Sequence, residues 1–391
     1  MSAVSVTTPT ISHEFVARLA ERAQEAEKLR RLPPATIDDL NASRFTDLLL
    51  PVRYGGSQAD FPAILDPVRR MAHGCASSAW TIGFYALHNW VLALFDERAQ
   101  DEAFATRPFL APAPLAPTGR GVPTNDGVRL TGRWSWATGV MHGNWIIVGA
   151  LCGPEEDPAG IYPALALLPA ADIQIEDVWH TDGMRATGSN DVVITDVFVP
   201  AHRLVPVSDI YTGTAPGAAL HAADTYRWPM VPALALLAAM PALGSAERAA
   251  DIYAGRLSER VLAYEGVMQK DKPIAGAHIA EAHVRLRALR GLLADTVGEV
   301  ESIVATGDPV SRAVRGAARL AAAHIVHESR AVIGALLEAS GASAHFLDNP
   351  LQRIKRDVDV ICGHVVFDYD TSRELAAALT LGMKVPRTAM V

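Results

Sequence analysis

Two histidines lie where an acid–base group could serve a reaction. His88 is in an aromatic-rich segment with Tyr85 and Trp90, and His364 stands in the apolar stretch 360–367. Histidine suits proton exchange because its ordinary pKa lies close to working pH. A buried imidazole also needs a hydrogen-bond partner, so a satisfied core histidine is an equally good interpretation of His88 on pattern alone.

A second pair of residues could form one wall of a ligand site. Trp136 and Thr138 are two residues apart, so on a strand both side chains would point to the same face. An indole offers a flat apolar wall, and a hydroxyl offers a hydrogen bond to the edge of a ligand ring. From the residues alone, Trp136 as ordinary core packing and Thr138 as a satisfied strand hydroxyl remains an open alternative.

The segment 185–190 is a third candidate, with small polar residues around one glycine. Its members are Arg185, Thr187, Gly188 and Ser189. Such residues can present backbone N–H groups to a carbonyl or a phosphate. The same composition favours a tight β-turn, and the two interpretations are compatible.

Other catalytic patterns are weak or missing in the sequence. His324 and His327 have a spacing that could bind a metal, but no third ligand suggests itself, so no metal site is expected. The sequence contains no Gly-x-Gly-x-x-Gly, Walker loop or Gly-x-Ser-x-Gly. A nicotinamide site within this chain is therefore not expected.

The periodicity around these residues predicts helices, then short strands. Helical spacing is expected around 11–50, 61–72 and 76–95, with Pro33 and Pro34 as a break and Thr36 as the next N-cap. Short apolar or alternating runs between recurring prolines and glycines predict strands, at 128–130, 145–151, 164–168 and 192–199.

The remainder predicts a loop and a helical bundle. The loop is expected over 208–220, and long helices over 229–268, 277–305, 309–340 and 350–382. The fold class is therefore mostly α with a central β module. We expect a helical domain over 1–107, a β domain over 108–207 and a helical bundle over 208–391.

Composition bounds the partners of the 391-residue chain. The formal net charge is −8 and no basic block appears, so nucleic acid is not an expected partner. The three cysteines are far apart, which suggests neither a disulfide framework nor zinc and fits a reducing cytoplasm.

The apolar run 228–245 carries three prolines and is expected to be a buried helix rather than a membrane span. A hydrophobic content of 50% predicts a homotetramer, or at least a dimer, built on the bundle.

Two motifs resemble the strand motifs of acyl-CoA dehydrogenases. One is Gly-Arg-Trp-Ser-Trp-Ala-Thr-Gly at 132–139, and the other is Gly-Met-Arg-Ala-Thr-Gly-Ser-Asn-Asp at 183–191, followed by Phe-Val-Pro at 198–200. The resemblance implies an N-terminal helical domain, a small β-barrel or sheet domain and a C-terminal four-helix bundle. It also implies that Trp136 lies beside a flavin ring, that Thr138 reaches its N5 edge, and that the flavin lies near a subunit boundary.

The sequence departs from the dehydrogenases in their base segment. Arg356-Asp357 matches its start, but the expected Glu-Gly-Thr is missing and His364 stands near that region. These features, with 77–80, 88–90 and 349–353, resemble the two-component hydroxylases of the same superfamily, which act on 4-hydroxyphenylacetate and a steroid-derived phenol. An acyl-CoA dehydrogenase-type oxidoreductase, or a scaffold that has lost its cofactor, remains the alternative.

The hydroxylase resemblance implies a specific chemistry. A separate flavin reductase supplies reduced FMN or FAD, and O2 forms a C4a-hydroperoxyflavin that hydroxylates a small substrate, expected to be aromatic. His364 is then the first candidate for the group that binds or deprotonates the substrate, with His88 as the second. Thr138 is expected to hold the N5 proton, and Trp136, Arg185, Thr187, Gly188 and Ser189 to bind the cofactor.

Overall fold

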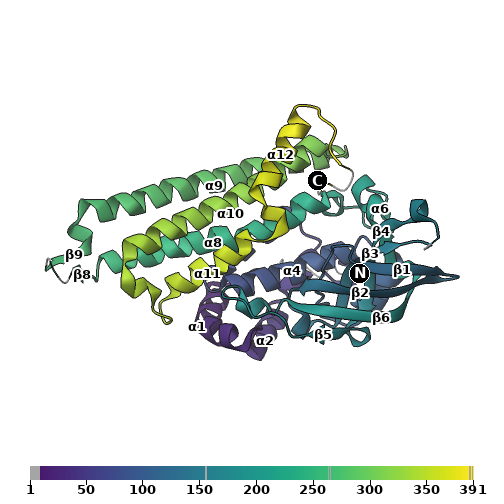
Figure 1. Ribbon diagram of the computed structural model, residues 1–391, viewed down its shortest axis with the longest axis horizontal. Helices are drawn as coiled ribbons and strands as arrows, with labels where there is room; N and C mark the ends of the chain where they lie inside the picture. The colour runs from purple at the N-terminus through teal and green to yellow at the C-terminus, as the bar shows by residue number, and fades with distance from the viewer. Residues whose placement is uncertain (1–8, 155, 263, 265, 387–388, 390) are drawn as a thin grey trace, which may run out of the picture.

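The computed structural model describes the chain except residues 1–8, 155, 263, 265, 387–388 and 390 (Figure 1). Three long helices lie side by side, and a seven-stranded sheet lies beyond the end of this bundle opposite the small hairpin β8–β9 (Figure 1). The N-terminal helices lie between the sheet and the bundle. The predicted order of helices, β module and helical bundle is confirmed.

The N-terminal part is helical. Its helices are α1 (His13–Leu29), α2 (Pro34–Ser43), α3 (Leu65–Met71), α4 (Ala76–Leu92) and α5 (Glu97–Phe104). The prediction that Thr36 caps the second helix is wrong, because Pro33 is the N-cap and Thr36 is buried inside the helix. A proline is well suited to the first helical position, here Pro34, because a free N–H is not needed there.

The sheet has seven strands in the order β5-β6-β2-β1-β3-β4-β7. They are β1 (Gly119–Thr124), β2 (Gly127–Ala137), β3 (Trp145–Cys152), β4 (Tyr162–Pro169), β5 (Gln174–Glu176), β6 (Asn190–Pro200) and β7 (Leu204–Pro206). The four predicted strand regions all lie in strands. Neighbours are antiparallel except β1 and β3.

The register of β2 and β6 has a direct consequence for the candidate residues. Ala137, the last residue of β2, pairs with Asn190, the first of β6. The chain just after β2 and the chain just before β6 are therefore neighbours. This places Thr138 beside Ser189.

The C-terminal part is a bundle in which α10 contacts all the other long helices. Its members are α8 (Met230–Leu257), α9 (Pro273–Thr306), α10 (Arg312–Ser340), α11 (Pro350–Cys362) and α12 (Tyr369–Thr380). The predicted single helix over 229–268 is wrong at its end, because the chain leaves α8 at Leu257 and forms the hairpin β8 (Val261–Leu262) and β9 (Val267–Met268). The predicted loop over 208–220 contains two short helices, α6 (Val207–Thr212) and α7 (Pro216–Leu220).

The last predicted helix, 350–382, is also interrupted. After α11 the chain forms a 3₁₀ turn at Val365–Phe367, and α12 begins only at Tyr369. Two local caps explain the break: the His364 side chain accepts from the Val366 N–H, and the Asp368 side chain accepts from the Thr371 N–H. Apolar periodicity alone continues through this segment and does not reveal the caps.

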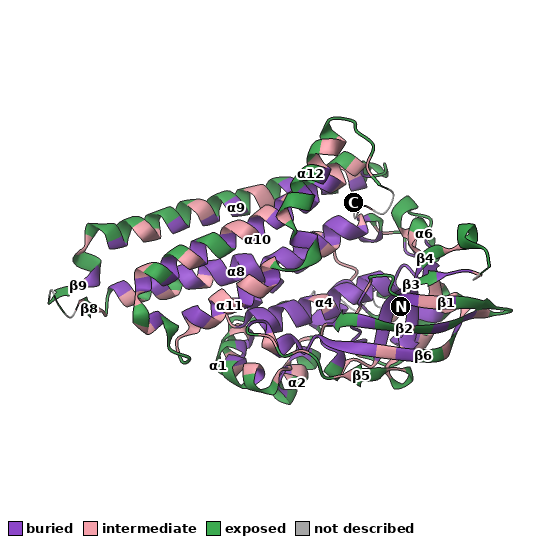
Figure 2. Ribbon diagram, in the orientation of Figure 1, coloured by how far each residue is buried: buried purple, intermediate pink, exposed green. Residues whose placement is uncertain are grey.

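The N-terminal helices and the bundle share one continuous hydrophobic core, and the interior of the sheet forms a second. Figure 2 shows α4 and α8 buried along most of their length, while α9 exposes an outer face. Two helices, α8 and α10, are long and apolar enough to cross a membrane by composition, but the apolar window of α8 is 94% buried inside the protein. The run 228–245 is thus a buried helix, as predicted.

Candidate active site

Helix α4 carries a row of aromatic rings that ends at His364. The ring of Trp80 lies 5.0 Å from that of Phe84, which lies 5.5 Å from His88. These residues are four apart, so they stack along one face of the helix. On the other side of Trp80, the imidazole of His364 lies at 5.6 Å in an edge-on arrangement. The structure therefore brings both candidate histidines into one row of four rings.

His88 is buried, and its two ring nitrogens have different states. Its Nδ1 lies 2.5 Å from the Ala111 carbonyl oxygen. Because a carbonyl can only accept, Nδ1 carries the proton and Nε2 has a free lone pair. Burial lowers the pKa of His88 to about 4, so the ring is neutral at pH 7. His88 can therefore accept a hydrogen bond through Nε2.

His364 has the opposite tautomer. The Val366 N–H donates to its Nδ1 at 3.3 Å, so the neutral ring carries its proton on Nε2. Burial lowers the pKa of His364 to about 4, although the side chain still has exposed surface. The lowered pKa and the exposed surface are compatible, because neighbouring protein atoms surround the imidazole while one side of it stays open. His364 therefore presents an N–H donor where a ligand can reach it.

Helix α10 fixes the turn that carries His364. Arg319, itself buried, donates to the carbonyls of Val365 and Val366 at 3.2 and 3.3 Å. His327 donates through Nε2 to the Phe367 carbonyl at 3.0 Å. Three successive carbonyls of the turn are thus held from one helix.

His324 and His327, the two histidines with metal-ligand spacing, have other partners. His327 is occupied by Phe367, and Nδ1 of His324 lies 2.8 Å from the Tyr369 hydroxyl. Among the residues that the structure describes, no group of three or more histidine, cysteine or carboxylate side chains could hold a metal ion.

Thr138, Ser189 and Thr187 form a chain of hydroxyl groups. The Oγ1 of Thr138 lies 2.9 Å from the Oγ of Ser189, which lies 2.7 Å from the Oγ1 of Thr187. Thr187 then donates to the Met184 carbonyl at 2.9 Å. Three of the predicted site residues are therefore in direct contact.

The expectation that Trp136 and Thr138 share one face of a strand is wrong. Strand β2 ends at Ala137, and Thr138 belongs to the turn that follows. Trp136 is 61% exposed, whereas Trp134 on the same strand is fully buried. The alternative of Trp136 as ordinary core is therefore wrong too. Its indole lies 6.4 Å from that of Trp179, edge-on.

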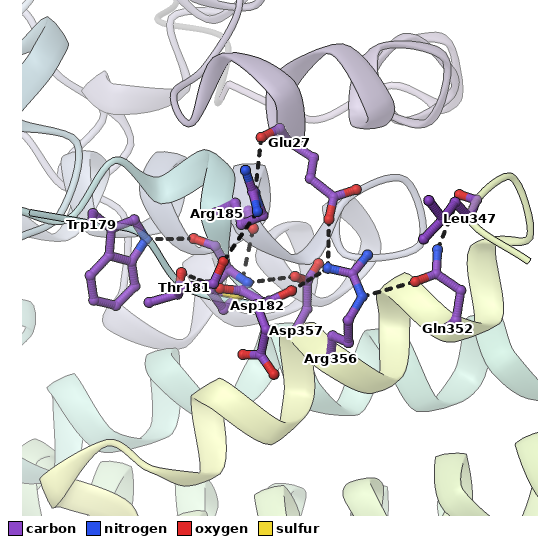
Figure 3. Close-up of polar contacts among 12 residues, drawn as sticks. Glu27, Trp179, Thr181, Asp182, Arg185, Leu347, Gln352, Arg356 and Asp357 are labelled. Atoms are coloured by element: carbon purple, nitrogen blue, oxygen red, sulfur yellow. Dashed lines mark hydrogen bonds and ion pairs between the residues drawn. The ribbon is translucent and has the colours of Figure 1, made fainter. Parts of the chain in front are cut away.

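Arg185 and Gly188 lie at the two ends of the turn before Ser189. Arg185 points to α1 and to its own loop, donating to the carbonyls of Glu27 at 3.3 Å and Thr181 at 3.4 Å (Figure 3). It therefore anchors the turn in the described contacts rather than joining the hydroxyl chain. Gly188 has a left-handed φ of 52°, a conformation that glycine adopts without steric cost.

Asp357 is a site-supporting residue that the sequence pattern did not identify as one. It is buried on α11 and accepts the Met184 N–H at 2.6 Å (Figure 3). Burial raises its pKa to about 6. Gly183 allows this approach, because a Cβ there would lie 2.1 Å from the Arg356 carbonyl oxygen.

Arg356, next to Asp357, also fastens α11 to the N-terminal part. Its guanidinium donates to the Glu27 carboxylate at 2.6 Å and to the carbonyl of Asp182 (Figure 3). The pair that resembles the start of the dehydrogenase base segment therefore holds the 183–188 turn. An aspartate on an otherwise apolar helix face was the available signal, since a buried carboxylate needs a partner.

Helix α4 also joins the ring row to the hydroxyl chain. Ser77 contacts the sulfur of Met184 at 3.6 Å, and the Tyr85 hydroxyl donates to the carbonyl of Gly139. The same helix therefore supports the aromatic row, the Met184 turn and the turn after β2.

These residues fit a flavin. The exposed indole of Trp136 offers an aromatic wall, and the adjacent hydroxyl of Thr138 offers a polar contact to a ring edge. The sequence-based prediction of the cofactor agrees with this arrangement.

Comparison with known proteins gives a consistent family. Residues 236–369 match the family described as "Acyl-CoA dehydrogenase, C-terminal domain". The chain is 35% identical over 342 residues, 87% of this chain and 86% of the relative, to the flavin-dependent monooxygenase oxygenase subunit HsaA of Mycobacterium tuberculosis.

Solved structures agree over nearly the whole length. The 3-HSA hydroxylase from Rhodococcus sp. RHA1 has a TM-score of 0.91 at 32% identity and covers 97% of both chains. XiaF from Streptomyces sp., solved with FADH2 and glycerol, has a TM-score of 0.89 at 27% identity and covers 96% of this chain and 95% of its own. The similarity includes the N-terminal helices, the sheet and the bundle.

Proposed function

The chain belongs to the family of flavin-dependent monooxygenase oxygenase subunits, and from this premise we propose that it hydroxylates a small aromatic compound using reduced FMN or FAD from a separate reductase. The observation that carries the proposal is the row of four rings from His88 to His364, with histidines of opposite tautomer. An aromatic substrate can stack along such a row while its polar substituent meets an imidazole.

The residues of the site would have separate roles toward the flavin. Bound reduced flavin supplies the electrons that activate O2 for transfer of one oxygen atom to the substrate. Thr138 would hold the proton of the ring edge, and Trp136 would cover the ring. Buried α4 keeps water away from the reacting atoms, which limits the wasteful release of peroxide.

The two histidines would serve opposite ends of the aromatic row, because Phe84 and Trp80 lie between them. His364 can donate its Nε2–H to a phenol oxygen, whereas His88 can accept a hydrogen bond through Nε2 at the other end of the row. Both rings are neutral at working pH because their pKa values lie near 4. Each can act without first gaining or losing a proton.

Electron supply is the direct test of the proposal. The pure protein with flavin should not oxidise NADH or NADPH, because the sequence lacks a dinucleotide fingerprint. Addition of a flavin reductase should start conversion of phenols to catechols, which chromatography detects. Robust NADH oxidation without a reductase, or no product from any phenol with one, would contradict the proposal.

We also propose a homotetramer assembled through the bundle. Support comes from the outer face of α9, where Ile274 is 63% exposed and Val284 is 70% exposed. Apolar side chains on an exposed helix face are typical of an interface between subunits.

A further inference from the structure

The hydroxyl chain from Met184 to Thr138 has a fixed direction. The Met184 carbonyl receives the Thr187 hydroxyl at 2.9 Å, the Trp179 indole N–H at 3.0 Å and the Thr187 N–H at 3.1 Å. A carbonyl oxygen can only accept hydrogen bonds. The single hydroxyl proton of Thr187 is therefore committed to Met184.

The remaining two protons follow from this one. A hydroxyl group has one proton, so Thr187 must accept from Ser189 in the contact of 2.7 Å. Ser189 has then used its proton and must accept from Thr138 in the contact of 2.9 Å. Thr138 is left with lone pairs only, so its oxygen can accept a further hydrogen bond but cannot donate one.

Burial keeps this direction fixed. Thr187 is 2% exposed and Ser189 is 3% exposed, so water cannot readily take over a partner in the middle of the chain. Reversing the chain would take the Thr187 hydroxyl from Met184 and leave a lone pair facing the carbonyl oxygen, which is unfavourable in a buried place. An isolated surface threonine would instead rotate to donate or accept as required.

We propose that this directed hydroxyl chain makes the site select the reduced state of the flavin over the oxidised state. The inference rests on the proposed placement of Thr138 at the N5 edge. Reduced flavin carries a proton on N5, and this N–H can donate a hydrogen bond to the Thr138 oxygen. In oxidised flavin N5 is an acceptor, so two lone pairs would face each other. The selection comes from Ser189, Thr187 and Met184, which need not contact the flavin.

Selection of this kind suits an enzyme that receives its flavin from another protein. Reduced flavin must be captured before it reacts with O2 in solution, and oxidised flavin must leave before the next turnover. One hydrogen bond that forms only with the reduced ring favours both steps. The Oγ1 atom of Thr138 would then favour both the binding of reduced flavin and the release of oxidised flavin.

The test measures binding rather than turnover. Dissociation constants for oxidised FMN in air and for photoreduced FMN without oxygen would be determined by equilibrium dialysis, and their ratio compared between variants. Thr187→Val removes the central hydroxyl at nearly constant volume. Ser189 can then donate to Thr138, and Thr138 can donate to an acceptor. The preference for reduced flavin should fall about five- to tenfold, the scale of one hydrogen bond.

Two matched variants distinguish an effect of the directed hydroxyl chain from a general disturbance of the loop structure. Thr187→Ser keeps the hydroxyl and should keep the wild-type ratio. Thr181→Val removes another hydroxyl-to-carbonyl bond from the same loop, the 2.7 Å contact with Gly183, and should not alter the ratio. If Thr187→Val keeps the wild-type ratio, or if Thr181→Val lowers it equally, the directed chain is overturned.

The Thr138→Val variant distinguishes this failure from failure of the site placement. If neither affinity changes in Thr138→Val, Thr138 does not meet N5 and the placement itself is wrong. If Thr138→Val weakens reduced-flavin binding while Thr187→Val leaves the ratio intact, the placement stands and only the directed chain fails.

Discussion

His364 and His88 show how hydrogen-bond partners assign roles to identical side chains. Both rings are neutral at pH 7, yet a backbone N–H fixes one tautomer and a backbone carbonyl fixes the other. The side-chain types in the sequence do not show this difference, because the partners are the backbone groups of Val366 and of the distant Ala111. The assignment requires the folded chain.

Loss of His364 should uncouple the reaction. His364→Ala should bind reduced flavin and consume O2, but it should release hydrogen peroxide and lower product formation by about 10²–10⁴-fold. His364→Asn, which keeps an N–H donor, should retain more product than alanine does. Product and peroxide per NADH consumed are the measurements. If His364→Ala hydroxylates at the wild-type rate and with wild-type coupling, His364 has only a structural role.

Loss of the Thr138 hydroxyl should act at a different stage. Thr138→Ala removes the acceptor at the end of the hydroxyl chain, so the N5 proton is held less well. Peroxide release should rise even when no substrate is present, as a peroxide assay after mixing with reduced flavin and O2 would show. In His364→Ala, by contrast, the rise should require substrate. Identical behaviour of the two variants would contradict separate roles.

At the scale of elements, helices α4 and α11 position the site from opposite sides. Helix α4 supplies the aromatic row and contacts both turns, and α11 holds the 183–188 turn through Asp357. Burying the Asp357 carboxylate costs folding free energy, because desolvation raises its pKa to about 6. Its ionised form is therefore disfavoured in the folded protein relative to the unfolded chain.

This cost predicts a pH dependence of stability. The folded protein holds the Asp357 proton more tightly than the unfolded chain, so the contribution of this group to stability falls as pH rises from about 4 to about 6. Asp357→Asn keeps an oxygen for the Met184 N–H but does not titrate. The stability of the variant relative to wild type should increase by on the order of 2–3 kcal/mol between pH 4 and 7.

Urea unfolding at the two pH values measures this change. Asp348→Asn, at an exposed position before the same helix, is the control and should differ from wild type by less than about 0.5 kcal/mol at either pH. A relative stability of Asp357→Asn that does not change with pH would show that the carboxylate is not desolvated as described.

The elements also show what the sequence could and could not predict. Helices, strands and the order of the three parts followed from apolar periodicity and from prolines and glycines. The ends did not: α8 stops at Leu257, and the caps by His364 and Asp368 split the last helix. Thr138 was found, but its partners depend on the β2–β6 register, which no local pattern records. Asp357 was read as part of a motif, and its contact with Met184 joins segments far apart in sequence.

At the scale of the whole molecule, the outer face of α9 exposes Ile274 and Val284 among charged side chains such as Glu281 and Arg287. It lies on the bundle, on the side away from α8 and α10 (Figure 2). Covering this face with other copies of the chain would remove apolar surface from water, at about 25 cal/mol per Å².

The assembly can be measured by light scattering at micromolar concentration. We expect a mass near four times the monomer mass of 41.7 kDa for a tetramer, or near twice the monomer mass for a dimer. Val284→Glu, which puts a charge on the α9 face, should shift the protein to smaller species. Val122→Glu, the same change at a 37% exposed position on β1, should not. A wild-type monomer would contradict the proposed assembly.

The aromatic row has a consequence for the order in which the protein is made. Trp80, Phe84 and His88 are translated well before His364. At about 5–20 residues per second, a bacterial or eukaryotic ribosome would need roughly 15–60 s to travel from one to the other. During that interval the nascent chain gains Thr138, Thr187 and Ser189 but lacks both Asp357, which holds the 183–188 turn, and the imidazole that completes the row. The aromatic row can therefore be completed only after His364 has been translated.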